Sequence, residues 1–454
     1  MADRRHPQHA SGTAGAVTHV IFARLGGVAR DVVVIGSIGA IGVLTIPVGA
    51  QAQDWPEFRG PGGQGHSTER GVPLEWSEKQ NVAWKIPVPG QGWSSPVVSD
   101  GRIWLTTAVE DRGVSLRAVA FDAATGREVV NVEVFRTRSP AARHPKNSHA
   151  SPSAVVEGDR VYVHFGTDGT AALTTAGEVV WKTQFHYESQ HGAGGSPVLH
   201  GDLLILNCDG GDAAFVVALD KRTGKTRWKT SRRQPWAQAY TTPLVIQVGD
   251  REQVVSVGAF RAAAYDPQTG KEIWRVSYGD GFSNVPRPVF GHGLVYIATG
   301  FFQPAILAVR PDGTGDVSKT HVGWTLKRGA PLTPSPLVVG DELYVVTDAG
   351  IATCLNARTG DVLWQQRLNG TFSASPLFAD GRIYFLAEDG VATVVAPGPQ
   401  YRRLASNTLD GTTLASMAVA GGSIYIRSAT HLYRIGRERT APGDVRNEPT
   451  FIPR

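Results

Sequence analysis

The sequence predicts an all-β protein, an eight-bladed β-propeller of four-stranded antiparallel blades. Three observations predict it: a motif that recurs along the chain, a turn pattern that follows the motif, and an orphan strand near the start. The motif is a Ser-Pro pair, or an equivalent pair, that opens a hydrophobic segment. It begins at Ser95, Ser151, Ser196, Thr242, Arg287, Ser335, Ser375 and Ser416. A spacing of roughly 40–56 residues is typical of propeller blades built from four short strands.

A hairpin turn follows in the second half of each repeat. It has an Asp or Asn, a Thr three residues later, a Gly at the fourth position and a Trp at the eighth. Full sets begin at Asp220, Asp266 and Asn356, and partial sets include Asp122 and Gly177. The Asp or Asn side chain can accept hydrogen bonds from the turn, and the Gly supplies a positive φ. The Trp is expected on the outer strand, wedged against the neighbouring blade.

The eighth repeat is expected to be completed by the start of the chain. It supplies three strands, the last at Tyr433-Arg434-Ile435, and lacks its Trp arm. Residues 81–85 are an orphan copy of that arm, so we expect Trp84 in the closing strand. Pairing the two would cover strand edges that otherwise promote aggregation. The propeller is therefore expected over 81–436, after an N-terminal extension at 53–80 and before a flexible tail at 437–454.

These motifs together resemble the pyrroloquinoline-quinone-type (PQQ-like, or quinoprotein-like) propeller repeat, over about 81–436. The family so named holds two groups. One is the quinone-dependent alcohol dehydrogenases, and the other is cofactor-free propellers such as the lipoprotein BamB of the outer-membrane β-barrel assembly machinery. The opening Trp55-Pro56-Glu57-Phe58-Arg59-Gly60-Pro61 also resembles the start of exported bacterial propellers. The resemblance implies the fold and leaves the activity open, because propellers host many functions.

Residues 1–52 predict a secretory signal peptide. Arg4 and Arg5 lie in a positive region, an apolar stretch runs from Val32 to Ile46, and Ala50-Gln51-Ala52 offers a cleavage site. We therefore expect a periplasmic or secreted protein with no transmembrane domain after cleavage. The predicted cleavage site has no Cys, so the lipid anchor of the assembly-factor lipoproteins is not expected.

The charge balance argues against a nucleic-acid partner. The chain carries a formal net charge of +5 at pH 7, and residues 1–52 contribute four Arg against two Asp, which leaves +3 for the rest. The sequence contains no basic run with interleaved aromatic residues. We expect a monomer whose partners are envelope proteins.

The two cysteines bear on the cofactor. Cys208 and Cys354 fall in strands of the third and sixth blades, too far apart for a disulfide, which needs Cα atoms within about 7 Å. Both are expected to be buried core residues. The resemblance implies that the dehydrogenases use an adjacent Cys-Cys disulfide, an Asp base and a calcium bound by Glu and Asn. This chain has no adjacent Cys pair and no recognisable nucleophile, zinc or phosphate motif. We therefore expect no cofactor, neither PQQ nor calcium, and assign no catalytic or metal-binding residue.

A ligand site is expected where loops converge on the central funnel. The candidates lie in loops before the first strand of a blade or between its second and third strands. They are Asn147, His149, His191, Asp209, Asp212 and Arg287. His149, His191 and Asp209 could together bind a metal, with ordinary loop packing as the alternative. Arg287 replaces the Ser or Thr of the repeat beside the axis.

Three functions remain open at this point. The first is a protein-binding scaffold of the cell envelope, BamB-like in outer-membrane protein assembly, with the basic stretch from Phe135 to Asn147 as its partner loop. The second is a quinone- or metal-dependent oxidoreductase with its site in the funnel. The third is a propeller that binds carbohydrate or another small ligand on an aromatic platform of Trp93, Trp236 and Tyr240.

Overall fold

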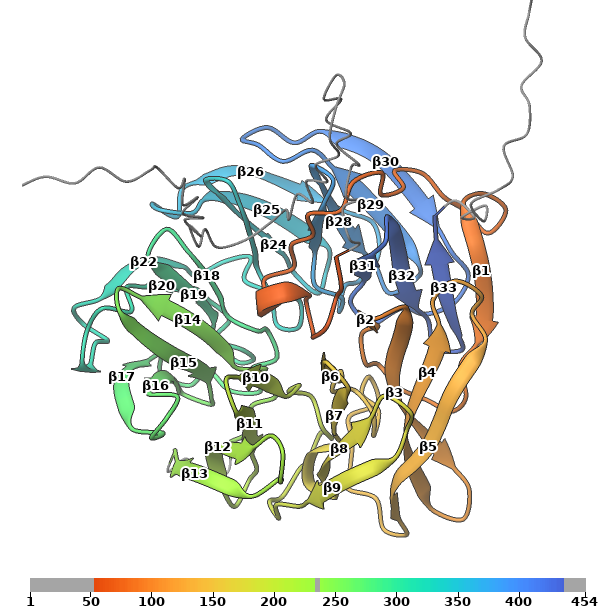
Figure 1. Cartoon of the computed structure of the whole chain (residues 1–454). Coiled ribbons are helices and arrows are strands. Elements are labelled where there is room, and N and C mark those ends of the chain that lie inside the picture. The colour runs from red at the N-terminus through yellow and green to blue at the C-terminus, as the bar shows by residue number, and fades with distance from the viewer. Residues whose placement is uncertain (1–52, 233–236, 437–454) are drawn as a thin grey trace, which may run out of the picture. The chain divides into compact units, whose positions relative to one another are not determined.

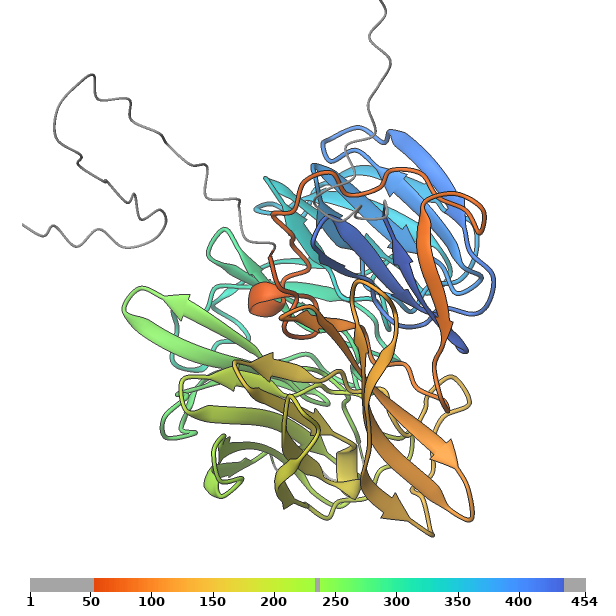
Figure 2. The ribbon, with the colours of Figure 1, turned by 45° about the vertical axis from the view of Figure 1, so that its right-hand side comes forward.

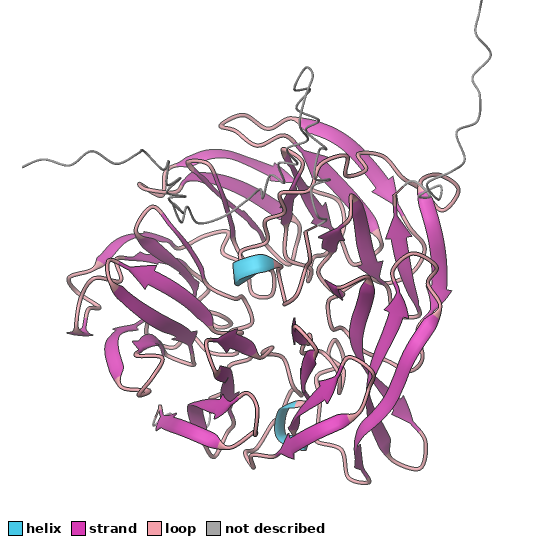
Figure 3. Ribbon diagram, viewed as in Figure 1, coloured by secondary structure: helices cyan, strands magenta, loops and turns pink. Residues whose placement is uncertain are grey.

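The eight repeats fold into eight sheets arranged as the blades of a ring (Figure 1). The computed structural model of the chain describes residues 53–232 and 237–436. Within these ranges the only helices are two 3-10 turns, η1 (Pro61–Gly63) and η2 (Gly166–Asp168), and the rest is strand and loop (Figure 3). The predicted eight-bladed, all-β propeller is confirmed. The predicted signal peptide at 1–52 and tail at 437–454 lie outside the described residues.

The first four blades follow the chain in order. Blade 1 contains β2 (Val97–Ser99), β3 (Arg102–Glu110), β4 (Val114–Asp122) and β5 (Glu128–Thr137). Blade 2 contains β6 (Val155–Glu157), β7 (Arg160–His164), β8 (Thr170–Thr174) and β9 (Val179–Thr183). Blade 3 contains β10 (Val198–His200), β11 (Leu203–Asp209), β12 (Ala214–Asp220) and β13 (Thr226–Ser231). Blade 4 contains β14 (Leu244–Val248), β15 (Arg251–Val257), β16 (Arg261–Tyr265) and β17 (Glu272–Ser277).

The last four blades complete the ring. Blade 5 contains β18 (Val289–Gly291), β19 (Leu294–Ala298), β20 (Ile306–Val309) and β22 (Val322–Leu326). Blade 6 contains β23 (Leu337–Val339), β24 (Glu342–Val346), β25 (Ile351–Asn356) and β26 (Val362–Arg367). Blade 7 contains β27 (Leu377–Ala379), β28 (Arg382–Leu386), β29 (Val391–Val395) and β30 (Arg403–Thr408). Blade 8 contains β31 (Ala418–Ala420), β32 (Ser423–Arg427), β33 (His431–Ile435) and β1 (Val82–Pro87).

Blade 4 differs from the four-stranded expectation, because a fifth strand lies against its outer edge. This strand, β21 (Gly315–Asp316), runs parallel to β17 and comes from the connection between β20 and β22 of blade 5. That connection is longer than the Asp-x-x-Thr-Gly turn it replaces. The extra residues reach across to the neighbouring blade and pair with its free edge.

The outer strand of blade 8 comes from the start of the described chain. Strand β1 lies antiparallel to β33, with Trp84 opposite Arg434, and the Gly436 N–H donates to the Asn81 carbonyl at 2.8 Å. The Trp84 ring packs on Tyr425 of β32 at a centroid distance of 6.2 Å. Two segments about 350 residues apart in sequence therefore share one sheet.

The predicted turns have the expected chemistry. The Asp220 carboxylate accepts hydrogen bonds from the N–H groups of Arg222 and Thr223 at 3.1 and 3.0 Å, and Gly224 has a φ of 70°. The same turn receives the tryptophan of the preceding blade, because the Trp181 indole donates to the Lys221 carbonyl at 3.0 Å. A Cβ added to Gly224 would lie 2.5 Å from that indole. The turn glycine thus also makes room for the neighbouring blade.

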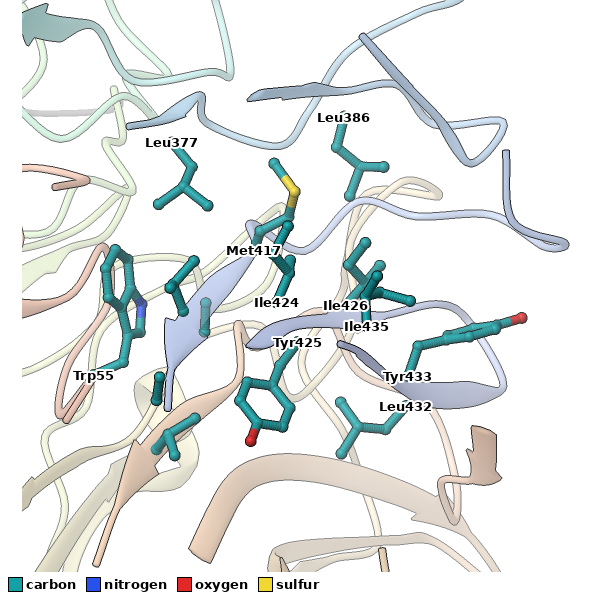
Figure 4. Close-up of a cluster of buried hydrophobic side chains, with 14 of the residues drawn as sticks. Trp55, Leu377, Leu386, Met417, Ile424, Tyr425, Ile426, Leu432, Tyr433 and Ile435 are labelled. Carbon is teal, nitrogen blue, oxygen red and sulfur yellow. The ribbon is translucent and has the colours of Figure 1, made fainter. Parts of the chain in front are cut away.

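Hydrophobic side chains fill the spaces between blades. Figure 4 shows one such cluster, in which Leu377 and Leu386 of blade 7 face Met417 and Ile424 of blade 8, with Trp55 beside them. Tyrosines at matching repeat positions pack on the docking tryptophans, as Tyr344 does on Trp364 at 6.0 Å. These recurring aromatic residues have a packing role. No helix among the described residues is long and apolar enough to cross a membrane.

The N-terminal segment, residues 53–80, runs across the ring before it enters blade 8 (Figure 2). Trp55 exchanges backbone hydrogen bonds with Val98 of blade 1, and the Pro56 carbonyl accepts from Val156 of blade 2 at 2.8 Å. On the other side of the ring, Arg59 donates to the Pro336 carbonyl at 2.7 Å and His66 bonds the Val338 carbonyl at 2.6 Å. This segment therefore fastens non-adjacent blades to one another.

Candidate functional site

A cavity of about 560 Å³ lies where the loops that precede the first strands converge. Its walls carry the aromatic side chains of Phe58, Trp93, Tyr240, Phe282 and Phe301, together with polar side chains from several blades. A volume in this range, mostly apolar with a few polar groups, is typical of a small-ligand site. The funnel is therefore the candidate functional site.

A nearly complete circuit of hydroxyl groups lies against this cavity. In seven of the blades the hydroxyl of the repeat's first residue accepts a hydrogen bond from the backbone N–H of the equivalent residue in the preceding blade. The seven N···O pairs, from 2.8 to 3.1 Å, are Ser95–Ser153, Ser153–Ser196, Ser196–Thr242, Arg287–Ser335, Ser335–Ser375, Ser375–Ser416 and Ser416–Ser95. We call these seven hydroxyls the hydroxyl circuit.

The circuit corrects the alignment of the second repeat. The equivalent residue is Ser153, and the predicted Ser151-Pro152 lies two residues too early. The Ser151 hydroxyl instead donates to Asn147 Oδ1 at 2.5 Å, within the loop. The proline after Ser151 imitates the motif of the other blades, and a one-dimensional pattern cannot separate the two serines.

Arg287 interrupts the circuit, because it has no hydroxyl to offer Thr242. Its side chain is 1% exposed and donates to the Glu57 carboxylate at 3.1 Å and to the Phe58 carbonyl at 2.7 Å. Burial raises the pKa of Glu57, and the Arg287 charge opposes that shift. This predicted funnel residue is thus absent from the cavity lining and instead holds the N-terminal segment beside the axis.

Asn147 and His191, two of the candidates named from the sequence, both line the cavity and contact each other. The Asn147 amide donates to the His191 carbonyl at 2.6 Å. The Tyr240 hydroxyl lies 3.0 Å from His191 Nδ1 and donates to Gln238 Oε1 at 2.7 Å. Burial lowers the pKa of His191, with help from His144, so its imidazole is neutral at pH 7. The cluster offers neutral polar groups beside aromatic rings.

The other three candidates lie outside the cavity lining. His149 is half-buried, and burial together with the Arg143 charge lowers its pKa. Asp212 is exposed and accepts from the Glu188 N–H at 2.7 Å. Asp209 is buried against Arg232, with 3.1 Å between the charged groups. Within the ranges 53–232 and 237–436, no three His, Cys, Asp or Glu side chains are grouped so that they could hold a metal ion.

The buried Asp209 predicts a pH dependence of stability. Burial raises the pKa of Asp209 to about 6, against the opposing effect of Arg232. The folded state therefore binds the Asp209 proton more tightly than the unfolded state, and the resulting stability is lost as pH rises from about 4 to 6. The difference between the ordinary pKa of 3.8 and the folded-state pKa of about 6 corresponds to about 3 kcal/mol. The measured quantity is the difference in unfolding free energy between the natural chain and Asp209→Asn. We expect this difference to fall by about 2–3 kcal/mol between pH 4 and pH 7. A pH-independent difference in denaturant titrations would contradict this.

The cavity does not fit a calcium-bound quinone. Among the described residues that line it, the one carboxylate is Asp348, which already accepts from the N–H groups of Leu332 and Thr333 at 2.8 and 3.2 Å. Calcium takes six to eight oxygen ligands, with carboxylates prominent among them. Lys146, the one lysine or arginine of the described lining, is bound to Glu388 at 2.6 Å. Both cysteines are buried and free, as predicted.

Three basic side chains of the stretch from Phe135 to Asn147 pair with acidic side chains. Lys146 pairs with Glu388 of blade 7, Arg143 lies 3.6 Å from Glu110, and Arg136 lies 2.6 Å from Glu133. Hydrogen bonds from Lys146 and Ser373 lower the pKa of Glu388 against the raising effect of burial. The stretch therefore contacts acidic groups of other elements through Arg143 and Lys146, while Arg138 is exposed and forms no ion pair with any described residue.

An aromatic patch beside the funnel was missed in the sequence. Phe301 and Phe302 are 53% and 65% exposed, and their rings lie 5.9 and 6.3 Å from that of Phe282. Phe260 packs on Phe282 at 6.4 Å. The sequence signal was the adjacent Phe pair after Thr299-Gly300, where a polar turn is usual. Trp93 and Tyr240 of the predicted platform line the cavity, whereas Trp236 lies outside the described residues. We call Phe260, Phe282, Phe301 and Phe302 the phenylalanine patch.

Comparison with known proteins places the chain in a family. The family profile described as outer membrane protein assembly factor BamB matches residues 68–257, 115–301 and 258–398. The BamB proteins of Shewanella oneidensis and Burkholderia pseudomallei are 25% and 28% identical over 47% and 49% of this chain. The chain spans about half the length of these relatives, 55% and 56%. The quinohemoprotein alcohol dehydrogenase ADH IIB of Pseudomonas putida is 27% identical over 75% of this chain and 50% of its own length.

Solved structures agree on the fold. BamB from Moraxella catarrhalis superposes with a TM-score of 0.55 at 13% identity, covering 78% of this chain and 99% of that one. The quinohemoprotein alcohol dehydrogenase ADHIIG of Pseudomonas putida superposes with a TM-score of 0.59 at 10% identity, covering 88% and 82%. Since the family profile covers most of the described propeller, the chain belongs to the PQQ-like repeat family described as outer membrane protein assembly factor BamB.

Proposed function

We propose that this propeller is a protein-binding scaffold of the cell envelope that holds a partner at the funnel face through the phenylalanine patch. The observation that carries the proposal is the exposure of Phe301 and Phe302, 53% and 65%, next to the funnel cavity. Exposed aromatic clusters mark interaction sites, and buried aromatic anchors supply much of the energy of protein interfaces. The names of the BamB relatives support an envelope role. Residues 1–52 would direct export to the periplasm or beyond.

The backbone conformation of the phenylalanine patch also supports a role in binding. Phe302 has a φ of 80° and Phe260 a φ of 65°. Bulky side chains rarely adopt this left-handed region, which costs on the order of 1–3 kcal/mol per residue. Such strain is tolerated where the surrounding structure imposes it, and it is concentrated at binding sites. Phe260 and Phe302 thus hold their rings at this edge of the funnel in a strained backbone conformation.

Site-specific photocrosslinking in the native cells tests the proposal. A photoreactive phenylalanine at position 302 should crosslink a small, reproducible set of envelope proteins, and Phe301→Ser should remove those products. The matched control is the same probe at Leu363 on β26, which is also exposed, at 38%. Equal products from both positions, or none from position 302, would reject the scaffold at this face.

A further inference from the structure

We infer that the funnel cavity is a binding site for an uncharged carbohydrate of one or two sugar rings. This site shares Phe282 and Phe301 with the phenylalanine patch, but the inference does not require the protein-binding role proposed above. The inference depends on three properties of the cavity: its unused hydroxyl donors, its charge and its aromatic walls.

The hydroxyl circuit supplies donors that the protein does not use. Each of the seven oxygens accepts one backbone N–H, but none of the seven hydroxyl protons is donated to an acceptor among residues 53–232 and 237–436. All seven side chains belong to buried residues and line the cavity. Buried polar groups normally find a partner, so these protons call for acceptors within the cavity.

The circuit also indicates the shape of the ligand. Its donors come from seven blades and therefore face a central molecule from nearly every side of the axis. A pyranose carries oxygen atoms around its whole rim, and these can accept from several blades at once. Phe58 lies in the same lining and is held there through its carbonyl by Arg287 at 2.7 Å. The Phe58 ring would contact the apolar face of a sugar, and the hydroxyl circuit would contact its polar edge.

The charge of the lining selects a neutral ligand. Its one described carboxylate, Asp348, is capped by two backbone N–H groups, and Lys146 is committed to Glu388. Burial keeps His191 neutral by lowering its pKa. An anionic ligand would therefore meet no free cation and one negative charge. The lining also includes Trp93, Tyr240 and the hydroxyls, which suit an uncharged, polyhydroxylated molecule.

Calorimetric titration of the full-length protein tests the inference. The probes are glucose, N-acetylglucosamine, maltose and cellobiose, with glucuronate and glucosamine as charged comparisons. We expect at least one neutral sugar to bind with a Kd of about 1 mM or lower, and glucuronate to bind at least about tenfold more weakly than glucose. Tryptophan fluorescence should change on binding, because Trp93 lines the cavity.

Matched variants distinguish this site from the protein-binding face. Leu414→Trp fills the cavity and should weaken sugar binding at least about tenfold, whereas Leu363→Trp on the outer strand β26 should leave it unchanged. Phe302→Ser should leave sugar binding intact and abolish partner crosslinking, since Phe302 is not part of the lining. The inference is overturned if no neutral sugar in the panel binds, if glucuronate binds best, or if Leu414→Trp binds sugar normally.

Discussion

Replacing Arg287 by methionine is expected to lower the free energy of unfolding by about 3 kcal/mol, because it leaves the largely buried Glu57 carboxylate without its cation. In the natural chain, Arg287 holds that carboxylate at 3.1 Å and also donates to the carbonyls of Phe58 and Pro243 at 2.7 and 3.0 Å. The loss should be measured by guanidinium denaturation. Limited proteolysis should show earlier cleavage within residues 53–80, since Arg287 holds that segment in place.

The double variant Glu57→Gln with Arg287→Met is the control for this prediction. It removes both charges, so it should be destabilised by clearly less than the sum of the two single losses. Such a coupling would identify the ion pair between Glu57 and Arg287 as the source of the destabilisation. Strictly additive losses would show that Arg287 acts only through its carbonyl contacts.

Replacing Gly270 by alanine should cost roughly 2–4 kcal/mol, through crowding and backbone strain together. Gly270 has a φ of 68°, and a Cβ there would lie 2.4 Å from the Trp228 ring that docks on this turn. The Trp228 indole also donates to the Pro267 carbonyl of the same turn at 2.8 Å. The added methyl would therefore push blade 3 away from blade 4. Thermal unfolding followed by circular dichroism measures the change.

Gly201 provides the matched control for the crowding effect. It also has a positive φ, 54°, but nothing lies within 4 Å of an added Cβ. Gly201→Ala should therefore cost only the backbone part, about 1 kcal/mol. In a Trp228→Ala background, the cost of Gly270→Ala should fall toward that small value, although Thr230 Oγ1 still lies 2.9 Å from the added Cβ. Equal losses at Gly201 and Gly270 would contradict a docking role for the tryptophan.

The fold could be predicted from the sequence because each blade repeats the same local chemistry. The turn that begins at Asp220 and the tryptophan that docks on it recur at fixed spacings, so periodicity alone identifies them. Features that break the period were not predictable. The fifth strand β21 arises where a turn is replaced by a longer loop, and Glu57 meets Arg287 across 230 residues of sequence.

The candidate site could be predicted only in part, because some of its contacts follow the repeat and others do not. Asn147 and His191 come together because equivalent loops of adjacent blades converge. Asp209 was expected in a loop, but β11 continues through Cys208 to Asp209 and carries the carboxylate into the interior, against Arg232. Sequence alone does not say where a strand ends. It also does not reveal that Lys146 pairs with Glu388 of blade 7.

The sheet shared by β1 and β33 sets an order of events during folding. Strand β1 is synthesised long before β33, so it has no partner while the other blades are made. Closing a loop of about 350 residues carries a large entropic cost and slows the final pairing. We infer that the ring closes late, in one step, after the last strand has emerged. Until then the edges of β1 and β33 lack their hydrogen-bonding partners, so the chain is most prone to misassembly during this interval.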